Sequence, residues 1–341
     1  MRLEFGLYVG VGSPAVPLHE QAALWAEHMK VARDNGFTAV AAPHHWLAHP
    51  AAFFQPLLTL ARLAAEPGDM ALVSSVVQLP LYSPVDMAEQ VASLDQISGG
   101  RFVLGVGLGY REQLFEAAGA RKLDRAGRFE ESIALMTRLW TGEETTFHGR
   151  HFRLTSGRIS LRPYQQPHPP IWIGAQSQAG VARAARLGDA WFMPPQASWS
   201  ELEQLTAHYR TELRQAGKSF PDRQPLMRSL VIGRSHREAI AEARVALNDL
   251  FAYYRPLGLQ EESTVRLHLS IDEEIARRSI VGDAQECADE FQRYIDLTGA
   301  TFFLLRLGKP GAEKFQTFQQ IGLLGSRVLP RLRLPKTEGT A

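Results

Sequence analysis

The sequence predicts an α/β fold, a (β/α)8 TIM barrel with insertions, from three observations. A short apolar run followed by a longer helical pattern recurs eight times along the chain. The apolar runs are nearly continuous, which is typical of parallel strands that helices cover on both faces. The 341 residues suit one closed barrel, although an open doubly wound sheet would use the same strands.

Each predicted strand is followed by its helix. The strands are expected, in chain order, at residues 4–9, 38–43, 70–79, 101–109, 170–175, 190–195, 226–233 and 301–307. The helices are expected at residues 18–36, 53–66, 83–100, 125–142, 178–188, 198–217, 235–254 and 313–332. Local signals support two of them, because Gly36 ends the first helix and Ser83 with Pro84 begins the third as cap and first turn.

Two insertions interrupt this alternation. Residues 145–170 alternate apolar and polar side chains around Ser156 and Gly157, which predicts a hairpin before the fifth strand. Residues 255–282 are polar and mixed, which suits a lid-like segment between the seventh and eighth strands. We expect a single domain over residues 1–334 and a frayed tail at residues 335–341.

Composition argues against several classes of partner. Lys and Arg number 37 against 36 Asp and Glu, so a net charge of +1 provides no field that attracts nucleic acid. The first residues, MRLEFGLYVG, lack the pattern of an export signal, and no apolar run approaches the length of a membrane span. The only cysteine, Cys287, allows no internal disulfide, so we expect a cytoplasmic protein without nucleic-acid or membrane partners.

Two adjacent histidines follow the second predicted strand. Because successive strand residues point to opposite faces, His44 and His45 cannot both be ordinary core residues. In a barrel of this class the site lies at the carboxyl ends of the strands, where a neutral imidazole accepts a proton and a charged one binds an anionic oxygen. A partly exposed loop pair is the alternative. A metal site is disfavoured, since no further ligands complete a zinc set.

Serines and glycines mark the next two strand ends. Ser74 and Ser75 lie in an otherwise apolar strand, so their hydroxyls need partners, either the neighbouring backbone or a ligand. Gly105, Gly107 and Gly109 alternate along the fourth strand and therefore fall on one face, which leaves room for a flat group or for close packing. The spacing is not that of a dinucleotide fingerprint.

The fifth strand ends in a turn suited to an anion. Gly174 and Ala175 lead into Gln176 and Ser177, and Gly180 lies in the first turn of the next helix. Free N–H groups, a hydroxyl and the positive helix end together favour a phosphate, and a capping role for Ser177 is compatible with this. Aromatic residues that could be core or the walls of a pocket for a planar ring lie near these strand ends: Tyr110, Trp46, Phe53, Trp172 and Trp191.

Four stretches carry a more specific pattern. They are APHHW at residues 42–46, SSVVQLPLYSPVDMAEQVASLDQISGGRFVLGVGLGY at 74–110, RPYQQPHPPIWIGAQS at 162–177 and IVGDAQECADEFQRYIDLTGATFFLLRL at 280–307. Together they resemble the bacterial luciferase-like monooxygenase family of flavin- and F420-dependent oxidoreductases. The resemblance extends over nearly the whole chain, and residues 84–109 are its most specific part.

The resemblance implies where a cofactor would lie. In this family the flavin or deazaflavin ring lies at the barrel mouth against a bulge on the third strand, often with a non-proline cis peptide. The matching stretch is SSVV, which assigns Ser74 and Ser75 to the ring. The turn after the fifth strand matches the family's phosphate site, which assigns Gln176, Ser177 and Gly180 to the cofactor tail.

The resemblance also implies catalytic residues. His44 matches the catalytic histidine of the luciferase alpha subunit, so His44 would face the flavin, while His45 or Trp46 would shape the pocket. Gly107 and Leu108 stand where the light-emitting alpha subunit has cysteine and arginine. Light emission is therefore not expected, and the arginine that would hold the phosphate has no evident replacement.

The resemblance implies a flavin-dependent monooxygenase that uses reduced FMN and molecular oxygen on a small, largely apolar organic substrate. An NAD(P)H-dependent flavin reductase would supply the electrons, since this chain shows no nicotinamide fingerprint. An F420-dependent dehydrogenase or reductase is the main alternative; a metal-dependent barrel hydrolase and a non-catalytic flavin-binding protein are others. A homodimer packed through residues 53–66 and 86–98 is expected from the family, although packing on the barrel would also explain these helices.

Overall fold

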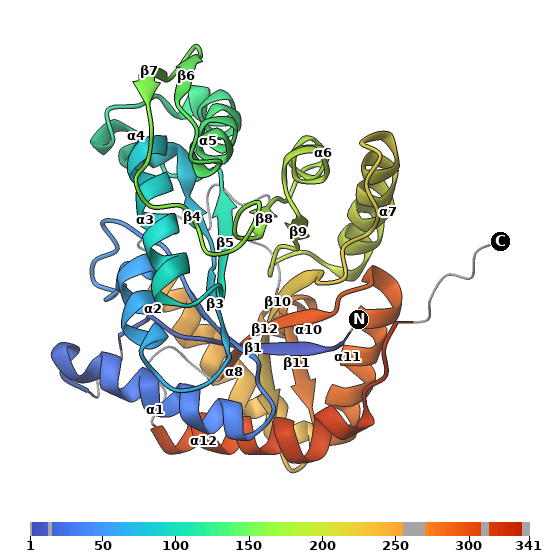
Figure 1. Cartoon of the computed structure of the whole chain (residues 1–341). Helices are drawn as coiled ribbons and strands as arrows, with labels where there is room; N and C mark the ends of the chain where they lie inside the picture. The colour runs from blue at the N-terminus through green and yellow to red at the C-terminus, as the bar shows by residue number, and fades with distance from the viewer. Residues whose placement is uncertain (1, 13–15, 255–269, 308–313, 336–341) are drawn as a thin grey trace.

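The computed structural model describes residues 2–12, 16–254, 270–307 and 314–335, and Figure 1 shows a curled sheet surrounded by helices. The strands are β1 Glu4–Tyr8, β2 Ala39–Ala42, β3 Ala71–Ser74, β4 Val77–Gln78, β5 Phe102–Gly107, β6 Thr145–His148, β7 Arg153–Gly157, β8 Ile171–Gly174, β9 Ala190–Phe192, β10 Pro225–Ile232, β11 Ser279–Gly282 and β12 Phe302–Leu307. The α-helices are α1 Gln21–Asp34, α2 Pro56–Ala64, α3 Pro84–Ile97, α4 Glu112–Ala117, α5 Arg125–Trp140, α6 Gln178–Leu187, α7 Trp199–Gln215, α8 His236–Tyr254, α10 Ile271–Arg278, α11 Ala284–Thr298 and α12 Lys314–Leu323.

The main sheet is parallel and curls back toward its own beginning. Its order is β11, β10, β12, β1, β2, β3, β5, β8 and β9, with β4 paired to β5. Met193, directly after β9, forms an isolated parallel bridge with Leu226 of β10, and its N–H donates to the carbonyl of Pro225 at 3.0 Å. This bridge joins the sixth and seventh of the eight predicted strands, which lie at opposite ends of the hydrogen-bonded order of those eight, and so brings the curled sheet into the arrangement of a barrel.

Side chains on the two faces of the sheet form separate cores. On β12, Phe302 and Leu304 point into the interior cluster, whereas Phe303 and Leu305 pack against the surrounding helices. This alternation is the period of two that strand geometry imposes. Arg306 continues the inward series, which places its charged side chain at the carboxyl end of the strands.

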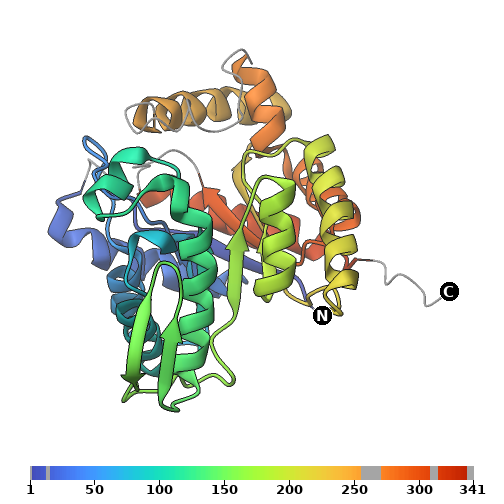
Figure 2. The same cartoon turned by 90° about the horizontal axis from the view of Figure 1, so that it is seen from above.

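The structure corrects two of the sequence-based expectations. The turn between β6 and β7 lies at residues 149–152, not at Ser156 and Gly157, because the carboxylate of Glu131 accepts the backbone N–H groups of all three residues from 150 to 152. In Figure 2 this antiparallel pair projects beside α5. Of the expected lid-like segment, residues 255–269 lie outside the described residues, while residues 271–278 form α10 and residues 279–282 form β11, which is part of the main sheet.

The third predicted strand is divided into β3 and β4. The peptide bond between Ser75 and Val76 is cis, as the family resemblance implied. The Ser74 hydroxyl donates to the carbonyl of Gly105 at 2.9 Å and accepts the N–H of the same residue at 2.9 Å. Its hydrogen bonds are thereby satisfied within the sheet, and they fix β3 to β5 where the backbone ladder is interrupted.

Two glycines of β5 make room for this irregular stretch. A Cβ atom on Gly105 would lie 1.9 Å from the carbonyl oxygen of Ser74, and one on Gly107 would lie 2.9 Å from a methyl group of Val76. The first contact involves backbone and cannot be relieved by a side-chain rotation. The alternating glycines therefore accommodate the bulge of the neighbouring strand.

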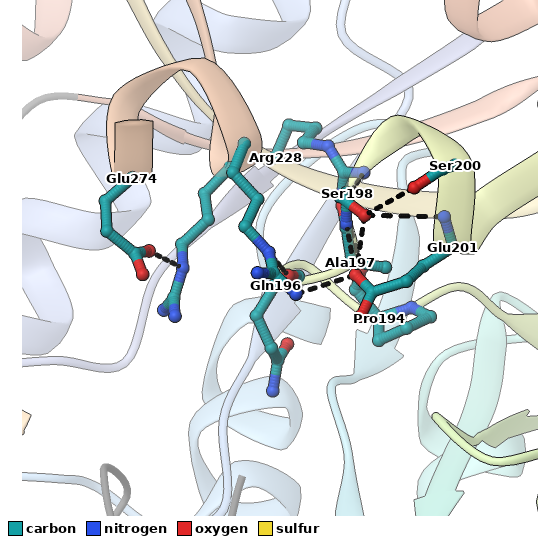
Figure 3. A network of polar contacts seen from close by, with 10 residues as sticks. Pro194, Gln196, Ala197, Ser198, Ser200, Glu201, Arg228 and Glu274 are labelled. Atoms are coloured by element: carbon teal, nitrogen blue, oxygen red, sulfur yellow. Dashed lines mark hydrogen bonds and ion pairs between the residues drawn. The ribbon is translucent and has the colours of Figure 1, made fainter. Parts of the chain in front are cut away.

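A buried arginine holds the segment that follows β9. Arg228 of β10 is fully buried, and its guanidinium donates to the carbonyls of Pro194 and Ala197, both at 3.1 Å (Figure 3). From the other side, Arg277 of α10 forms a 2.6 Å ion pair with Glu201, in the first turn of α7. Arg277 also donates to the carbonyl of Gln196 at 2.8 Å, so the two arginines supply donors to carbonyls that irregular backbone would otherwise leave without them.

We expect Gly105→Ala to lower the free energy of unfolding by at least about 3 kcal/mol, because the added methyl group forces β3 and β5 apart. Urea unfolding followed by circular dichroism measures this change. Gly322→Ala is the matched control: among the described residues, no atom beyond its chain neighbours and the backbone of α12 lies within 4 Å of its Cβ position, so helix propensity should raise stability by up to about 1 kcal/mol. Equal stability of the Gly105 variant and the wild type would contradict the account of the bulge.

Candidate active site

His44 fills the gap that opens between β2 and β4. The N–H of Ser75 still donates to Ala42 of β2 at 2.8 Å, but beyond this point the third strand pairs only with β5. Further along the strand, the N–H of Gln78 donates to Nδ1 of His44 at 3.1 Å, and the Gln78 side-chain amide donates to the His44 carbonyl at 3.2 Å. The imidazole thus takes the place of a strand carbonyl, and only 2% of the residue remains exposed.

These contacts determine the protonation state of His44. Burial lowers its pKa from 6.5 to about 4, so the ring is neutral at neutral pH. A backbone N–H can only donate, so Nδ1 must be the unprotonated nitrogen and Nε2 must carry the proton. Nε2 lies 2.9 Å from the hydroxyl oxygen of Tyr82, which therefore accepts this hydrogen bond.

Tyr82 and Trp46 cover the His44 ring. The Trp46 ring lies 5.6 Å from His44 and 5.3 Å from Tyr82, measured between centroids. The indole N–H donates to the side chain of Gln55 at 3.3 Å, and the Arg111 guanidinium donates to the Trp46 carbonyl at 2.9 Å. Trp46 is therefore an aromatic neighbour of His44 whose side chain and backbone are both held by hydrogen bonds.

His45 has a different environment from its neighbour. It is half-buried, and its ring lies 4.3 Å from that of Phe53. Burial, followed by the charges of His44, Arg306 and Arg111, lowers its pKa to about 3. Both histidines are therefore uncharged at neutral pH, and the positive charge acting on this region comes from arginines.

The bulge presents an apolar surface beside these residues. Ser75 and Val76 are half-buried, unlike the buried residues on either side of them. The methyl groups of Val76 lie in front of Gly107 of β5. One of them also lies 3.6 Å from the position that a Cβ atom on Gly174 of β8 would occupy. Gly109 follows β5, has a φ of +75° and lies next to the side-chain amide oxygen of Gln78. This oxygen is buried and has no hydrogen-bond partner among the described residues.

The turn after β8 has the capping geometry that the sequence predicted. Ser177 is the N-cap of α6, and its hydroxyl accepts the N–H of Gly180 at 3.2 Å. Gln176 and Ser177 are exposed, and the carbonyl of Ala175 accepts the indole N–H of Trp191 at 3.0 Å. The cap leaves the adjacent N–H groups at the start of the helix facing outward.

Two residues predicted to line a substrate pocket, Trp172 and Trp191, are buried in the structure. Trp172 points into the interior cluster against Phe302, with 4.8 Å between centroids, and only 2% of it is exposed. Trp191 is fully buried on the outer face, where its backbone N–H donates to the Tyr209 hydroxyl at 3.1 Å. The predicted site residues that lie around the ends of β2, β3 and β5 are His44, His45, Trp46, Phe53, Ser75 and the glycines of β5. The hydroxyl of Ser74 is hydrogen-bonded to the backbone of β5. Tyr110 follows β5 and is half-buried.

Sequence reasoning missed Gln78, Tyr82 and Arg306. Each had a signal: Gln78 and Arg306 are isolated polar residues in apolar runs, and Tyr82 directly precedes the Ser-Pro start of a helix. Among the described residues, no three His, Cys, Asp or Glu side chains are grouped so that they could hold a metal ion. Within the same part of the chain, no helix is both long and apolar enough to cross a membrane.

Comparisons with known proteins identify the family. Residues 3–301 match the luciferase-like monooxygenase family model. An F420-dependent glucose-6-phosphate dehydrogenase from Nakamurella multipartita is 30% identical over 261 residues, 74% of each chain. The oxygenase component of a flavin-dependent trigonelline monooxygenase from Acinetobacter baylyi is 25% identical over 291 residues, 79% of this chain and 78% of that protein.

The fold is also that of solved members. A monooxygenase from Streptomyces bottropensis superposes with a TM-score of 0.84 at 22% identity, covering 96% of this chain and 99% of that one. Its likeness supports the barrel-like arrangement of the curled sheet, while the matched family model and the relative at 30% identity support common descent. The chain therefore belongs to the luciferase-like monooxygenase family of flavin- and F420-dependent oxidoreductases.

Proposed function

We propose that this protein is a monooxygenase that uses reduced FMN and molecular oxygen to oxidise a small, largely apolar organic molecule. The observation that carries the proposal is the buried, neutral His44, which donates to the half-buried Tyr82 and accepts from Gln78, two residues after the half-buried Val76. This arrangement offers a planar ring an apolar platform with hydrogen-bond donors at its side. The relative named as an oxygenase component supports a separate flavin reductase as the electron source.

The residues at the carboxyl ends of the strands fit a flavin. Val76 would contact the ring, and the glycines of β5 and β8 keep the space around it clear of side chains. Gln176, Ser177 and the first N–H groups of α6 would hold the phosphate, because donors and the helix dipole favour an anion there. The buried amide oxygen of Gln78 is an acceptor suited to the polar edge of a ring. Reduced FMN, once bound, supplies the electrons that activate oxygen.

The chain's own residues would orient the substrate and keep water out. Trp46 and Phe53 provide apolar walls, and His44 is held neutral so that its Nε2–H donates to Tyr82. Low polarity in this region strengthens each remaining hydrogen bond. Arg306 adds a fixed positive charge from β12, as its effect on the pKa of His45 shows.

An F420-dependent dehydrogenase is the second candidate. It is favoured by the relative at 30% identity, which is named as an F420-dependent enzyme. The Val76 platform would serve a deazaflavin equally well, because both cofactors present a planar tricyclic ring. Hydride transfer would then replace oxygen chemistry, and no reductase would be needed.

Anaerobic titration with reduced FMN and, separately, with reduced F420 distinguishes the two. We expect tighter binding of reduced FMN, followed by its rapid oxidation when oxygen is admitted, both recorded by absorbance. Val76→Asp should weaken binding at least about tenfold, since a charge would face the ring, whereas Val245→Asp on the exposed side of α8 should not. Binding of F420 alone, without oxygen consumption, would overturn the monooxygenase proposal in favour of the dehydrogenase.

The lowered pKa of His44 predicts a pH effect on stability. The unfolded chain takes up a proton near pH 6.5, but the folded protein resists it down to about pH 4. The free energy of unfolding should therefore fall as the pH decreases through this window, by up to about 3 kcal/mol from this group, and should be unaffected by it above pH 6.5. His44→Gln removes this titration, so urea unfolding should give a shallower dependence on pH in the variant; identical slopes would contradict the assignment.

We further propose a homodimer formed through α2 and α3. These neighbouring helices expose large apolar side chains, with Leu58 74% and Ile97 62% accessible. Apolar residues exposed on adjacent helices are typical of an interface.

The interface can be tested by light scattering. The wild type should have twice the mass of one chain, and the Leu58→Asp, Ile97→Asp double variant should have the mass of one, because the new charges would be buried without partners. Leu123→Asp, at an equally exposed site elsewhere, is the control and should remain dimeric. A monomeric wild type would refute the proposal.

A further inference from the structure

Tyr82 occupies an unusual position beside His44. It follows the short helical turn at Leu79–Leu81, directly before the Ser83 cap of α3, and it is half-buried. Its hydroxyl oxygen lies 2.9 Å from Nε2 of His44, and its ring lies 5.3 Å from that of Trp46, measured between centroids. The phenol oxygen is therefore within hydrogen-bond distance of the imidazole.

The direction of the His44 contact fixes where the Tyr82 proton points. Because Gln78 donates to Nδ1, the proton of the neutral imidazole is on Nε2 and is donated to Tyr82. The proton of Tyr82 must then point away from His44. Among the described residues, no acceptor is within hydrogen-bond distance of it, so it is available to a bound molecule or to water.

His44 itself is poorly placed to exchange protons with a substrate. Both ring nitrogens are engaged, and 2% of the residue is exposed. A proton arriving at Nδ1 would meet the N–H of Gln78, which cannot rotate away because it belongs to the backbone of β4. The ring is therefore a fixed donor toward Tyr82.

We propose that Tyr82 is the proton donor of the reaction and that His44 is a positioning residue that acts through it. The inference rests on the proposed function and adds a residue to it. In the step, the O–H bond of Tyr82 breaks, its electron pair stays on the phenol oxygen, and the proton goes to an oxygen atom of the bound reactants that has gained negative charge. Solvent then returns a proton to Tyr82, and no oxidation state changes in this step.

The surroundings of Tyr82 suit this role. Burial raises the pKa of Tyr82 to about 12, so the residue stays protonated until a strongly basic oxygen is present. The phenolate left behind would receive the hydrogen bond from His44. Donors already in place cost no reorganisation when the charge develops.

The hydrogen-bond direction can be tested without any cofactor. Protein containing ¹⁵N-labelled histidine should show His44, assigned by its loss in His44→Gln, as the Nε2–H tautomer between about pH 6 and 8. Tyr82→Phe should retain this tautomer, because Gln78 still occupies Nδ1. An Nδ1–H tautomer or an imidazolium at neutral pH would overturn the proposal.

The donor role is tested with reduced FMN and oxygen. Tyr82→Phe should slow the oxidation of bound reduced FMN by about 10²-fold, the usual scale for a lost general acid, with its affinity changed less than about twofold. His44→Leu should give a similar loss, and His44→Gln, which keeps an acceptor and a donor, should restore most of the rate. Tyr164→Phe, at a residue 62% exposed, is the control and should leave the rate unchanged.

The outcomes separate the two proposals. Normal binding and unchanged oxidation in Tyr82→Phe would overturn the donor role and leave the proposed function intact. Failure to bind either FMN or F420 would overturn the proposed function and the donor role together.

Discussion

The hydrogen bond from the Gln78 N–H to Nδ1 of His44 is the contact on which the site depends. The bulge after Ser74 separates the third strand from β2 and leaves this N–H without a strand partner. A buried N–H without an acceptor costs about 1–3 kcal/mol, and the imidazole supplies the acceptor. The same bond selects the tautomer, so one contact both completes the sheet and orients the donor toward Tyr82.

Electrostatics at the site follow from that packing. His44 and His45 are kept neutral, chiefly by burial. Positive charge is instead carried by Arg306, which extends inward from β12, and by Arg111, which also holds the Trp46 backbone. Unlike imidazolium, guanidinium keeps its charge over the whole physiological range. An anionic group bound here would therefore meet a charge that does not vary with pH.

The eight main strands and their helices were predictable because continuous apolar runs and helical periodicity are properties of the local sequence. Strand β11 was missed, since SIVG is too short and too close to a polar helix to stand out. The opposite faces that Trp172 and Trp191 occupy were not predictable, because residue type does not tell on which side of a closed sheet a ring lies. The role of Tyr82 depends on a partner 38 residues away, a tertiary contact that no local pattern encodes.

The glycines of β5 show how a correct observation can have a different cause. Their alternation indicated free space along one face, yet the backbone of Ser74 and the side chain of Val76 occupy it. Val76 itself is half-buried, so part of its side chain remains accessible above these glycines. Substitutions at Gly105 therefore act through the sheet, while substitutions at Val76 act on whatever lies against it. Gly105 therefore affects the stability of the sheet, and the neighbouring Val76 affects what can bind against it. The side chain at position 76 can change without disturbing the packing of Gly105 against the backbone of Ser74.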